Sequence, residues 1–158
     1  AKVAATALAL IGLFNIIGCF IWGALGGRYS KKLMLALLYI ARSVGITVFI
    51  ALPISDTSAI LFASFIGLLW LGTVPLTSGL VAQIFGTQYM AMLYGFAFTS
   101  HQVGSFLGIW LGGIAFDSTG NYDAIWWGAI ILGIVAAIMH WPIDERPLVR
   151  SATQEIKT

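Results

Sequence analysis

The chain has 158 residues, of which 59% are hydrophobic and 9% are charged, and its formal net charge is +2. Soluble domains carry about 25% charged residues, so this composition, with a mean hydropathy of +0.96, indicates a membrane protein. The small net charge and the absence of a basic patch interleaved with aromatic residues argue against nucleic-acid binding. The single cysteine, Cys19, excludes an internal disulfide and is expected to be a buried small residue.

Five apolar segments are long enough to cross a bilayer, which takes about 20 residues of helix. They cover residues 3–25, 33–52, 59–79, 90–116 and 124–141, and the fourth is so long that it must tilt or leave the bilayer. The sequence therefore predicts an all-α membrane protein with a bundle of five transmembrane helices in residues 1–141. The polar tail, residues 142–158, lacks helical periodicity and is expected to be mobile, with a docked interaction segment as the alternative.

Positive residues collect on one side of the predicted bundle. By the positive-inside rule, the first loop and the C-terminal tail are predicted to be cytoplasmic, which makes the chain a multi-pass protein of a cell inner membrane with its N-terminus outside. Tryptophans at both ends of the last span fit aromatic belts at the two interfaces. The positive residues of the cytoplasmic side are Arg28, Lys31, Lys32, Arg146, Arg150 and Lys157, against Lys2 alone on the other side.

Asn15 lies midway along the first span, between Gly12 and Gly18, on a helix face suited to close packing. Its amide is a candidate for an interhelical hydrogen bond or for a contact with substrate.

Arg42 is the only charged residue deep inside a span, about 14 Å along the helix from Leu33 at 1.5 Å per residue. An arginine at that depth must face protein or water and needs acceptors. One interpretation is an anion-binding or gating residue, and the other is a structural lock within the bundle. Its partners are expected among backbone carbonyls near Pro75, the side chains of Asn15 or Gln102, and groups outside this chain.

The third span is interrupted by glycines and by Pro75, which has no backbone donor and leaves the carbonyl of Leu71 without its helical partner. Such an interruption is tolerated where the freed groups are buried in protein or face a water-filled cavity. Thr73 and Thr77 share one helix face, so this stretch is either part of a substrate site or a simple kink with its hydroxyls bonded back to the helix.

The fourth span carries Gly104, Gly108 and Gly112 at intervals of four residues, which places them on one stripe of a helix. A smooth stripe of this kind lets another membrane helix approach closely. His101 and Gln102 lie just before the stripe. His101 is a candidate for proton coupling, because its pKa suits transfer near neutral pH, or for a hydrogen bond across a helix contact.

Two stretches resemble the major facilitator superfamily. The first loop is similar to the G-x-L-x-D-R-x-G-R-K loop of that family, with Gly27 and Ser30 in place of its aspartate and second glycine. Residues 100–127, with S-H-Q-V-G, F-D-S-T-G-N-Y-D and W-W, look like helices 11 and 12 of bacterial members, nearest the monocarboxylate-porter-like branch. The matching positions of the first loop are Gly23, Leu25, Arg28, Lys31 and Lys32.

The resemblance implies that the five spans are helices 8–12 and that helices 1–7, the N-terminal half, are absent from this chain. It implies a secondary transporter of a small organic solute that works by alternating access. Arg42 and the branch resemblance together favour an organic anion such as a monocarboxylate. Proton symport is a further hypothesis, tied to His101. The first-loop cations would then act at a cytoplasmic gate or anchor.

A non-transporting helical membrane subunit or scaffold is the alternative function. We expect no enzyme activity, cofactor or metal, because the sequence has no metal-ligand cluster, no nucleophile–base pair and no phosphate loop. The expected partners are the lipid bilayer, a small-molecule substrate and the absent half.

Overall fold

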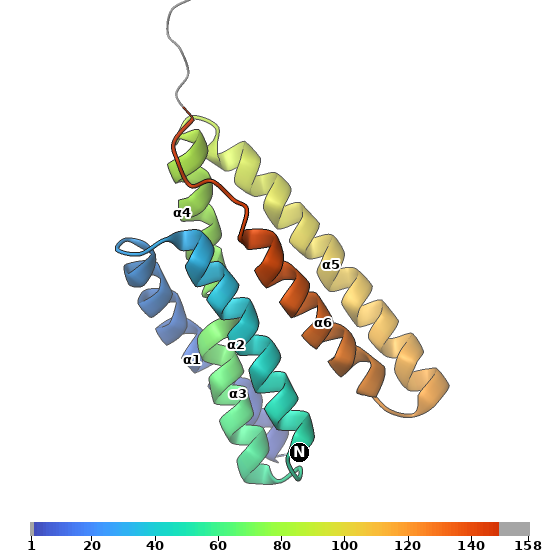
Figure 1. Ribbon diagram of the computed structural model, residues 1–158. Coiled ribbons are helices and arrows are strands. Elements are labelled where there is room, and N and C mark those ends of the chain that lie inside the picture. The colour runs from blue at the N-terminus through green and yellow to red at the C-terminus, as the bar shows by residue number, and fades with distance from the viewer. Residues whose placement is uncertain (1, 149–158) are drawn as a thin grey trace, which may run out of the picture.

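The computed structural model describes residues 2–148 of the chain, and within that range it contains six helices and no strand (Figure 1). Successive helices run in opposite directions, except that α4 continues the direction of α3. The helices are α1 (Lys2–Gly26), α2 (Lys31–Ala51), α3 (Asp56–Trp70), α4 (Thr73–Phe85), α5 (Met90–Thr119) and α6 (Asp123–His140).

Local sequence explains where these helices begin and end. The hydroxyl of Ser30 accepts a hydrogen bond from the backbone N–H of Leu33 at the start of α2, and Ser55 forms a reciprocal capping box with Ser58 at the start of α3. Two glycines with positive φ, Gly86 (78°) and Gly120 (74°), follow α4 and α5. They take up the left-handed half of φ space, which L residues with a side chain rarely adopt.

The structure agrees closely with four of the predicted segments and divides the fifth. The helices α1, α2, α5 and α6 begin and end within three residues of the predicted bounds, whereas residues 59–79 belong to two helices, α3 and α4. Four helical segments of the described chain are long and apolar enough to cross a membrane, namely α1, α2, α6 and residues 56–85 taken as one span. The helix α5 is not among them, because its polar stretch around His101 lowers the mean hydropathy, and it stays a predicted span.

Two helix pairs make the most extensive contacts, α1 with α3 and α2 with α6, and a small core joins them where α2 meets α4. Leu35, Leu38 and Leu76 are fully buried there. The helix α5 lies along the outside of this bundle and packs mainly on α4 and α6 (Figure 1). Most of its large apolar side chains are exposed, Ile109 to 79%.

Glycines set the close approach of α1 to α3. A Cβ atom added at Gly18 would clash with the backbone carbonyl of Leu68, and one added at Gly67 would lie 2.8 Å from the carbonyl oxygen of Ile11. The contact of α2 with α6 is similar, because Gly133 faces Ser43, whose hydroxyl donates to the carbonyl of Ile130 at 3.1 Å. Close backbone contact of this kind supplies the packing that membrane helices use in place of a hydrophobic driving force.

The two ends of the bundle differ in charge. One end, which we call the basic end, holds the α1–α2 turn, the α4–α5 turn and the chain after α6; its described charged residues are Arg28, Lys31, Lys32, Asp144, Glu145 and Arg146. The opposite end, the acidic end, carries Lys2, Asp56, Asp117 and Asp123. Arg150 and Lys157, which the sequence analysis assigned to the basic side, lie outside the described residues.

We predict that Gly18→Leu lowers the midpoint of thermal unfolding of the detergent-solubilised protein, followed by intrinsic tryptophan fluorescence. The added side chain must displace the backbone of α3, and overpacking costs about 1–3 kcal/mol. Gly12→Leu on the same helix is the matched control, because nothing lies within 4 Å of a Cβ atom added at Gly12. Equal midpoints for the two variants would show that α1 and α3 are not in close contact.

Candidate functional site

Polar side chains from two helices converge on the break between α3 and α4, which we call the helix break (residues 68–72). The helix α3 ends at Trp70 and α4 begins at Thr73, so Pro75 lies in the first turn of α4, where a missing N–H does no harm. Backbone groups at the end of α3 are left without helical partners. Because the surroundings are apolar, these groups need partners from neighbouring helices.

Three side chains of α1 supply partners on one side of the helix break. The side-chain oxygen of Asn15 accepts a hydrogen bond from the N–H of Leu71 at 3.1 Å, and the indole N–H of Trp22 donates to the carbonyl of Leu68 at 3.0 Å. The Cys19 thiol donates to the carbonyl of Leu71 at 3.6 Å. Residues 15, 19 and 22 are four and three positions apart, which places them on one face of α1.

Arg42 of α2 supplies the partner on the other side. Its Nη2 donates to the carbonyl oxygens of Leu69 and Trp70, each at 2.5 Å. The guanidinium carbon also lies 5.4 Å from the ring centroid of Tyr39 and 5.8 Å from that of Trp70, within the range of cation–π attraction. The buried Nε has no hydrogen-bond partner among the described residues. These contacts favour the interpretation of Arg42 as a structural lock over that of an anion-binding residue.

The structure shows different surroundings for the two threonines near Pro75. The hydroxyl of Thr73 donates to the carbonyl of Trp70 at 3.4 Å, so it bonds back to the helix end as in a simple kink. Thr77 lies one turn further along α4 and is half-buried. The prediction that Pro75 frees the carbonyl of Leu71 is wrong, because this carbonyl accepts the backbone N–H of Val74 at 3.0 Å. Side chains are bonded to the carbonyls of residues 68–71.

The candidate residues of α5 lie apart from the helix break. His101 and Gln102 are exposed, and no described hydrogen bond joins either of them to α1, α2 or α3. The ring of His101 lies 6.1 Å from that of Phe98 on the same helix. A Cβ atom added at Gly104, Gly108 or Gly112 would meet nothing within 4 Å. Within the described residues, the predicted close-packing stripe therefore has no partner.

The cations of the first loop bind neighbouring elements at the basic end. The Lys31 ammonium donates to the side-chain oxygen of Gln83 at 2.7 Å, and the Lys32 ammonium donates to the carbonyls of Trp141 and Ile143 at 3.3 and 2.7 Å. Lys31 and Lys32 therefore tie the start of α2 to the ends of α4 and α6. Of the other predicted gate residues, Arg28 is exposed and Gly23 faces Pro75.

The chain after α6 is docked in its described part, residues 141–148, which we call the C-terminal segment. The Glu145 carboxylate accepts a hydrogen bond from the backbone N–H of Lys32 at 2.8 Å, and its backbone carbonyl accepts one from the Gln83 amide at 3.0 Å. The N–H of Leu148 donates to the carbonyl of Ile84 at 2.9 Å. The expectation of a mobile tail is wrong for these residues, and the docked alternative describes them.

The pKa of the Glu145 carboxyl lies below its usual range. Partial desolvation raises it, but hydrogen bonds from the Lys32 backbone, the Ser30 hydroxyl and the Lys31 backbone, together with the charge of Lys31, outweigh that effect. The ionised form of Glu145 is therefore the form that holds the C-terminal segment in place.

Sequence reasoning overlooked Trp22, Gln83 and Glu145. Trp22 continues the spacing of Asn15 and Cys19 on α1, so the helical period was an available signal. Gln83 and Glu145 had no such signal, because their partners are distant in sequence. The described residues contain no group of three His, Cys, Asp or Glu side chains that could hold a metal ion.

Comparisons with known proteins agree with a membrane transporter family. Residues 1–157 match the model of the Major Facilitator Superfamily, so the chain belongs to this family. It is 31% identical over 121 residues to YcxA, an uncharacterised MFS-type transporter of Bacillus subtilis (strain 168). The match covers 73% of this chain and 29% of the relative, so the chain spans less than a third of that protein's length. No solved structure matches the chain significantly.

We predict that Asn15→Leu speeds hydrogen exchange at the amide of Leu71, because this substitution removes the acceptor and leaves the amide unpaired. An amide left without its partner in apolar surroundings costs about 1–3 kcal/mol, so exchange should be faster by roughly one to two powers of ten. The measurement is hydrogen–deuterium exchange by mass spectrometry on peptides covering residues 65–75. Ile16→Leu, next to it on an exposed face, is the control. Unchanged exchange in Asn15→Leu would contradict the hydrogen bond.

We predict that the C-terminal segment detaches in acid. Docking lowers the pKa of Glu145, so the Glu145 carboxylate stabilises the docked segment fully above the ordinary carboxyl pKa of 4.5. This stabilisation is lost as the pH falls through the lower pKa of the docked form. Limited proteolysis of residues 141–148 between about pH 7 and about pH 3 with an acid-stable protease measures this. Glu145→Gln should be cut readily throughout, with little pH dependence. A wild-type segment cut equally at every pH would contradict the prediction.

Proposed function

We propose that this chain forms part of a secondary transporter for a small organic solute that works by alternating access. The observation that carries the proposal is the helix break, where polar side chains of α1 and α2 bind the backbone ends of an interrupted span in a member of the Major Facilitator Superfamily. Discontinuous helices often flank the central sites of transporters. A pair of packed half-helices also gives two rigid segments with a joint between them.

In this proposal the chain is most of the C-terminal half of the transporter. The helices α1 and α2 are helices 8 and 9, α3 and α4 together form helix 10, and α5 and α6 are helices 11 and 12. The length of the relative supports this assignment, because the match covers 29% of that protein and leaves room for helices 1–7, which are the N-terminal half and the first helix of the C-terminal half.

The uncovered face of α5 is the proposed boundary with that other half. His101, Gln102, Gly104 and Gly108 are exposed in the described chain, and a Cβ atom added at Gly104, Gly108 or Gly112 would meet nothing within 4 Å. A polar group next to a smooth stripe suits a helix that lines a pathway and slides or tilts against another helix. His101 is the proposed proton carrier of a symport mechanism, and Gln102 a proposed substrate contact.

The basic end is the proposed cytoplasmic side, by the positive-inside rule. The contacts of Lys31 and Lys32 there support a role in anchoring a cytoplasmic gate, since they link α2, α4 and the C-terminal segment. The protein would then be a multi-pass protein of the inner membrane with a cytoplasmic C-terminus.

A monocarboxylate or another organic anion is the proposed substrate class, on the resemblance of α5 and α6 to the monocarboxylate-porter-like branch. Arg42 adds little to this preference, because both of its nearest acceptors are backbone carbonyls. The contacts of Arg42 and Asn15 support positioning roles at the helix break, and Thr77 is the remaining candidate for substrate contact on that span. The rival function is a non-transporting membrane scaffold.

The test is uptake of radiolabelled organic acids and neutral solutes into proteoliposomes that contain the full-length protein, with and without a pH gradient. We expect saturable uptake of an organic acid that the gradient stimulates. His101→Gln should abolish the stimulation and leave uptake down a substrate gradient within about threefold of wild type, because only the proton step is lost. Ser105→Ala, one turn further along the exposed part of α5, is the matched control.

The outcomes separate the alternatives. If Arg42→Met loses uptake of neutral and anionic solutes together, Arg42 is a structural lock. If Arg42→Met loses only the uptake of anions, Arg42 binds the anion. A well-folded protein that takes up none of these solutes would favour the scaffold.

A further inference from the structure

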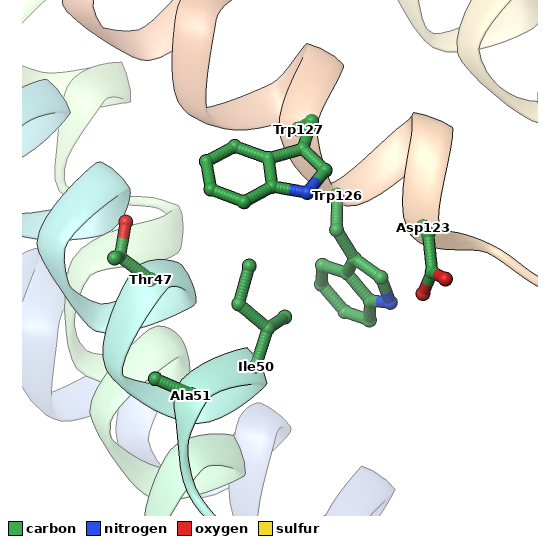
Figure 2. Close-up of a pocket in the computed structure, with 6 residues that line it drawn as sticks. All are labelled: Thr47, Ile50, Ala51, Asp123, Trp126 and Trp127. Carbon is green, nitrogen blue, oxygen red and sulfur yellow. The ribbon is translucent and has the colours of Figure 1, made fainter.

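A pocket of about 260 Å³ opens at the acidic end, between the end of α2 and the start of α6 (Figure 2). Figure 2 shows the indoles of Trp126 and Trp127 and the carboxylate of Asp123 on α6, with Ile50 rising toward them from α2. Trp126 and Trp127 follow Asp123 by three and four positions, so each indole lies on the side of the helix that carries the acid. Thr47 and Ala51 complete the lining.

The aromatic wall of the pocket is held in place from behind. The ring of Trp126 meets Phe49 of α2 at 6.0 Å and Phe62 of α3 at 6.1 Å, both edge to face, and these two phenylalanines stack on each other at 4.1 Å. Trp127 has no such support and is 56% exposed. One indole is therefore fixed, and the other is free to close over a bound group.

The carboxylate and the two indole N–H groups at the pocket have no partner within the described chain, whereas the hydroxyl of Thr47 donates to the carbonyl of Ser43 at 2.8 Å. No described hydrogen bond or ion pair involves the carboxylate of Asp123, and none involves either indole N–H. An indole N–H usually has an acceptor when it lies in a protein interface. The pocket thus combines a negative charge, two aromatic faces and two free donors, and this combination matches a cation that carries an acceptor nearby.

An apolar groove continues from the pocket toward the middle of the bundle. This groove, of about 280 Å³, lies between the same two helices and shares Thr47 with the pocket. Its walls are almost entirely apolar and include Ile40 and Val44 of α2 and Ile130 and Ile134 of α6. From Ala51 to Ile40 the two hollows extend about 16 Å along α2, at 1.5 Å per residue.

We propose that the pocket and groove together bind a phospholipid whose headgroup ends in an ammonium group, with the headgroup between Asp123 and the two indoles and an acyl chain along the groove. The carboxylate pairs with the ammonium, the aromatic faces add cation–π attraction, and the indole N–H groups donate to phosphate or ester oxygens. Trp126 and Trp127 lie at the start of a membrane helix, and tryptophans at helix ends are typical of the membrane interface, where lipid headgroups lie.

A lipid fits better than a water-soluble amine because of the groove. A small soluble cation would occupy only the pocket and would gain nothing from an apolar continuation about as large as the pocket itself. A lipid without an ammonium group would place a negative phosphate beside Asp123 with no positive charge to offset it.

The experiment is native mass spectrometry of the full-length protein, released from nanodiscs that contain equal amounts of phosphatidylethanolamine and phosphatidylglycerol. We expect preferential retention of phosphatidylethanolamine. Asp123→Asn and Trp127→Leu should each lower its retention about fivefold, as loss of a favourable contact of about 1 kcal/mol requires, without changing that of phosphatidylglycerol. Trp127→Phe, which keeps an aromatic face, should lose less and shows that the effect does not come from misfolding.

Asp117→Asn is the matched control, since Asp117 is an acid of the same end that lines neither hollow. Water-soluble glycerophosphoethanolamine, added at millimolar concentration, tests whether the headgroup alone suffices. Equal retention of the two lipids, the same loss in Asp117→Asn as in Asp123→Asn, or displacement of the lipid by glycerophosphoethanolamine would each overturn the proposal. The outcome does not depend on whether the protein transports a solute.

Discussion

The interrupted backbone between α3 and α4 is the constraint on which the rest of the structure depends. Unpaired carbonyl and N–H groups in an apolar medium cost several kcal/mol each, so the break is stable only if other helices supply partners. Here Asn15, Cys19 and Trp22 do so from α1, and Arg42 does so from α2. Both helices must therefore lie within hydrogen-bond distance of the same few residues, and the glycine contact between α1 and α3 makes that approach possible.

Hydropathy predicts most of the fold because membrane helices are long and uniformly apolar. Helix propensity predicts the weak point of the third span, because Pro75 and its neighbouring glycines disfavour helix. Neither signal predicts which carbonyls need partners, because the set of unpaired carbonyls depends on the residue at which α3 ends. The partners of Arg42 are 27 and 28 residues away in sequence, and only the packing of α2 against the break brings them there. The sequence indicated a close-packing face at Gly18, but it did not indicate Gly67 or the partner helix, because a glycine shows that close approach is possible and not which helix approaches.

The basic end shows how a polar segment without periodicity can still be ordered. The chain after α6, residues 142–158, is polar overall and lacks helical periodicity, so the sequence predicts a mobile tail. Lys32 changes this outcome, because its ammonium binds the carbonyls at the end of α6 while its backbone N–H binds Glu145. One residue thus satisfies groups at the start of α2 and at the end of α6 together. These hydrogen bonds join residues that are far apart in sequence, so the local sequence does not predict them.

The helix α4 connects the helix break and the basic end to α5, the helix with the exposed face. It begins at the helix break, ends beside Lys31 and the C-terminal segment, and is a main neighbour of α5 within the described chain. Because the break separates α4 from α3, α4 has a joint at one end and polar contacts with neighbouring elements at the other. A shift of α4 about that joint would move α5 and strain the contacts of Gln83 at the basic end. If the other half of the proposed transporter covers the glycine stripe of α5, this single helix links that half to the basic end.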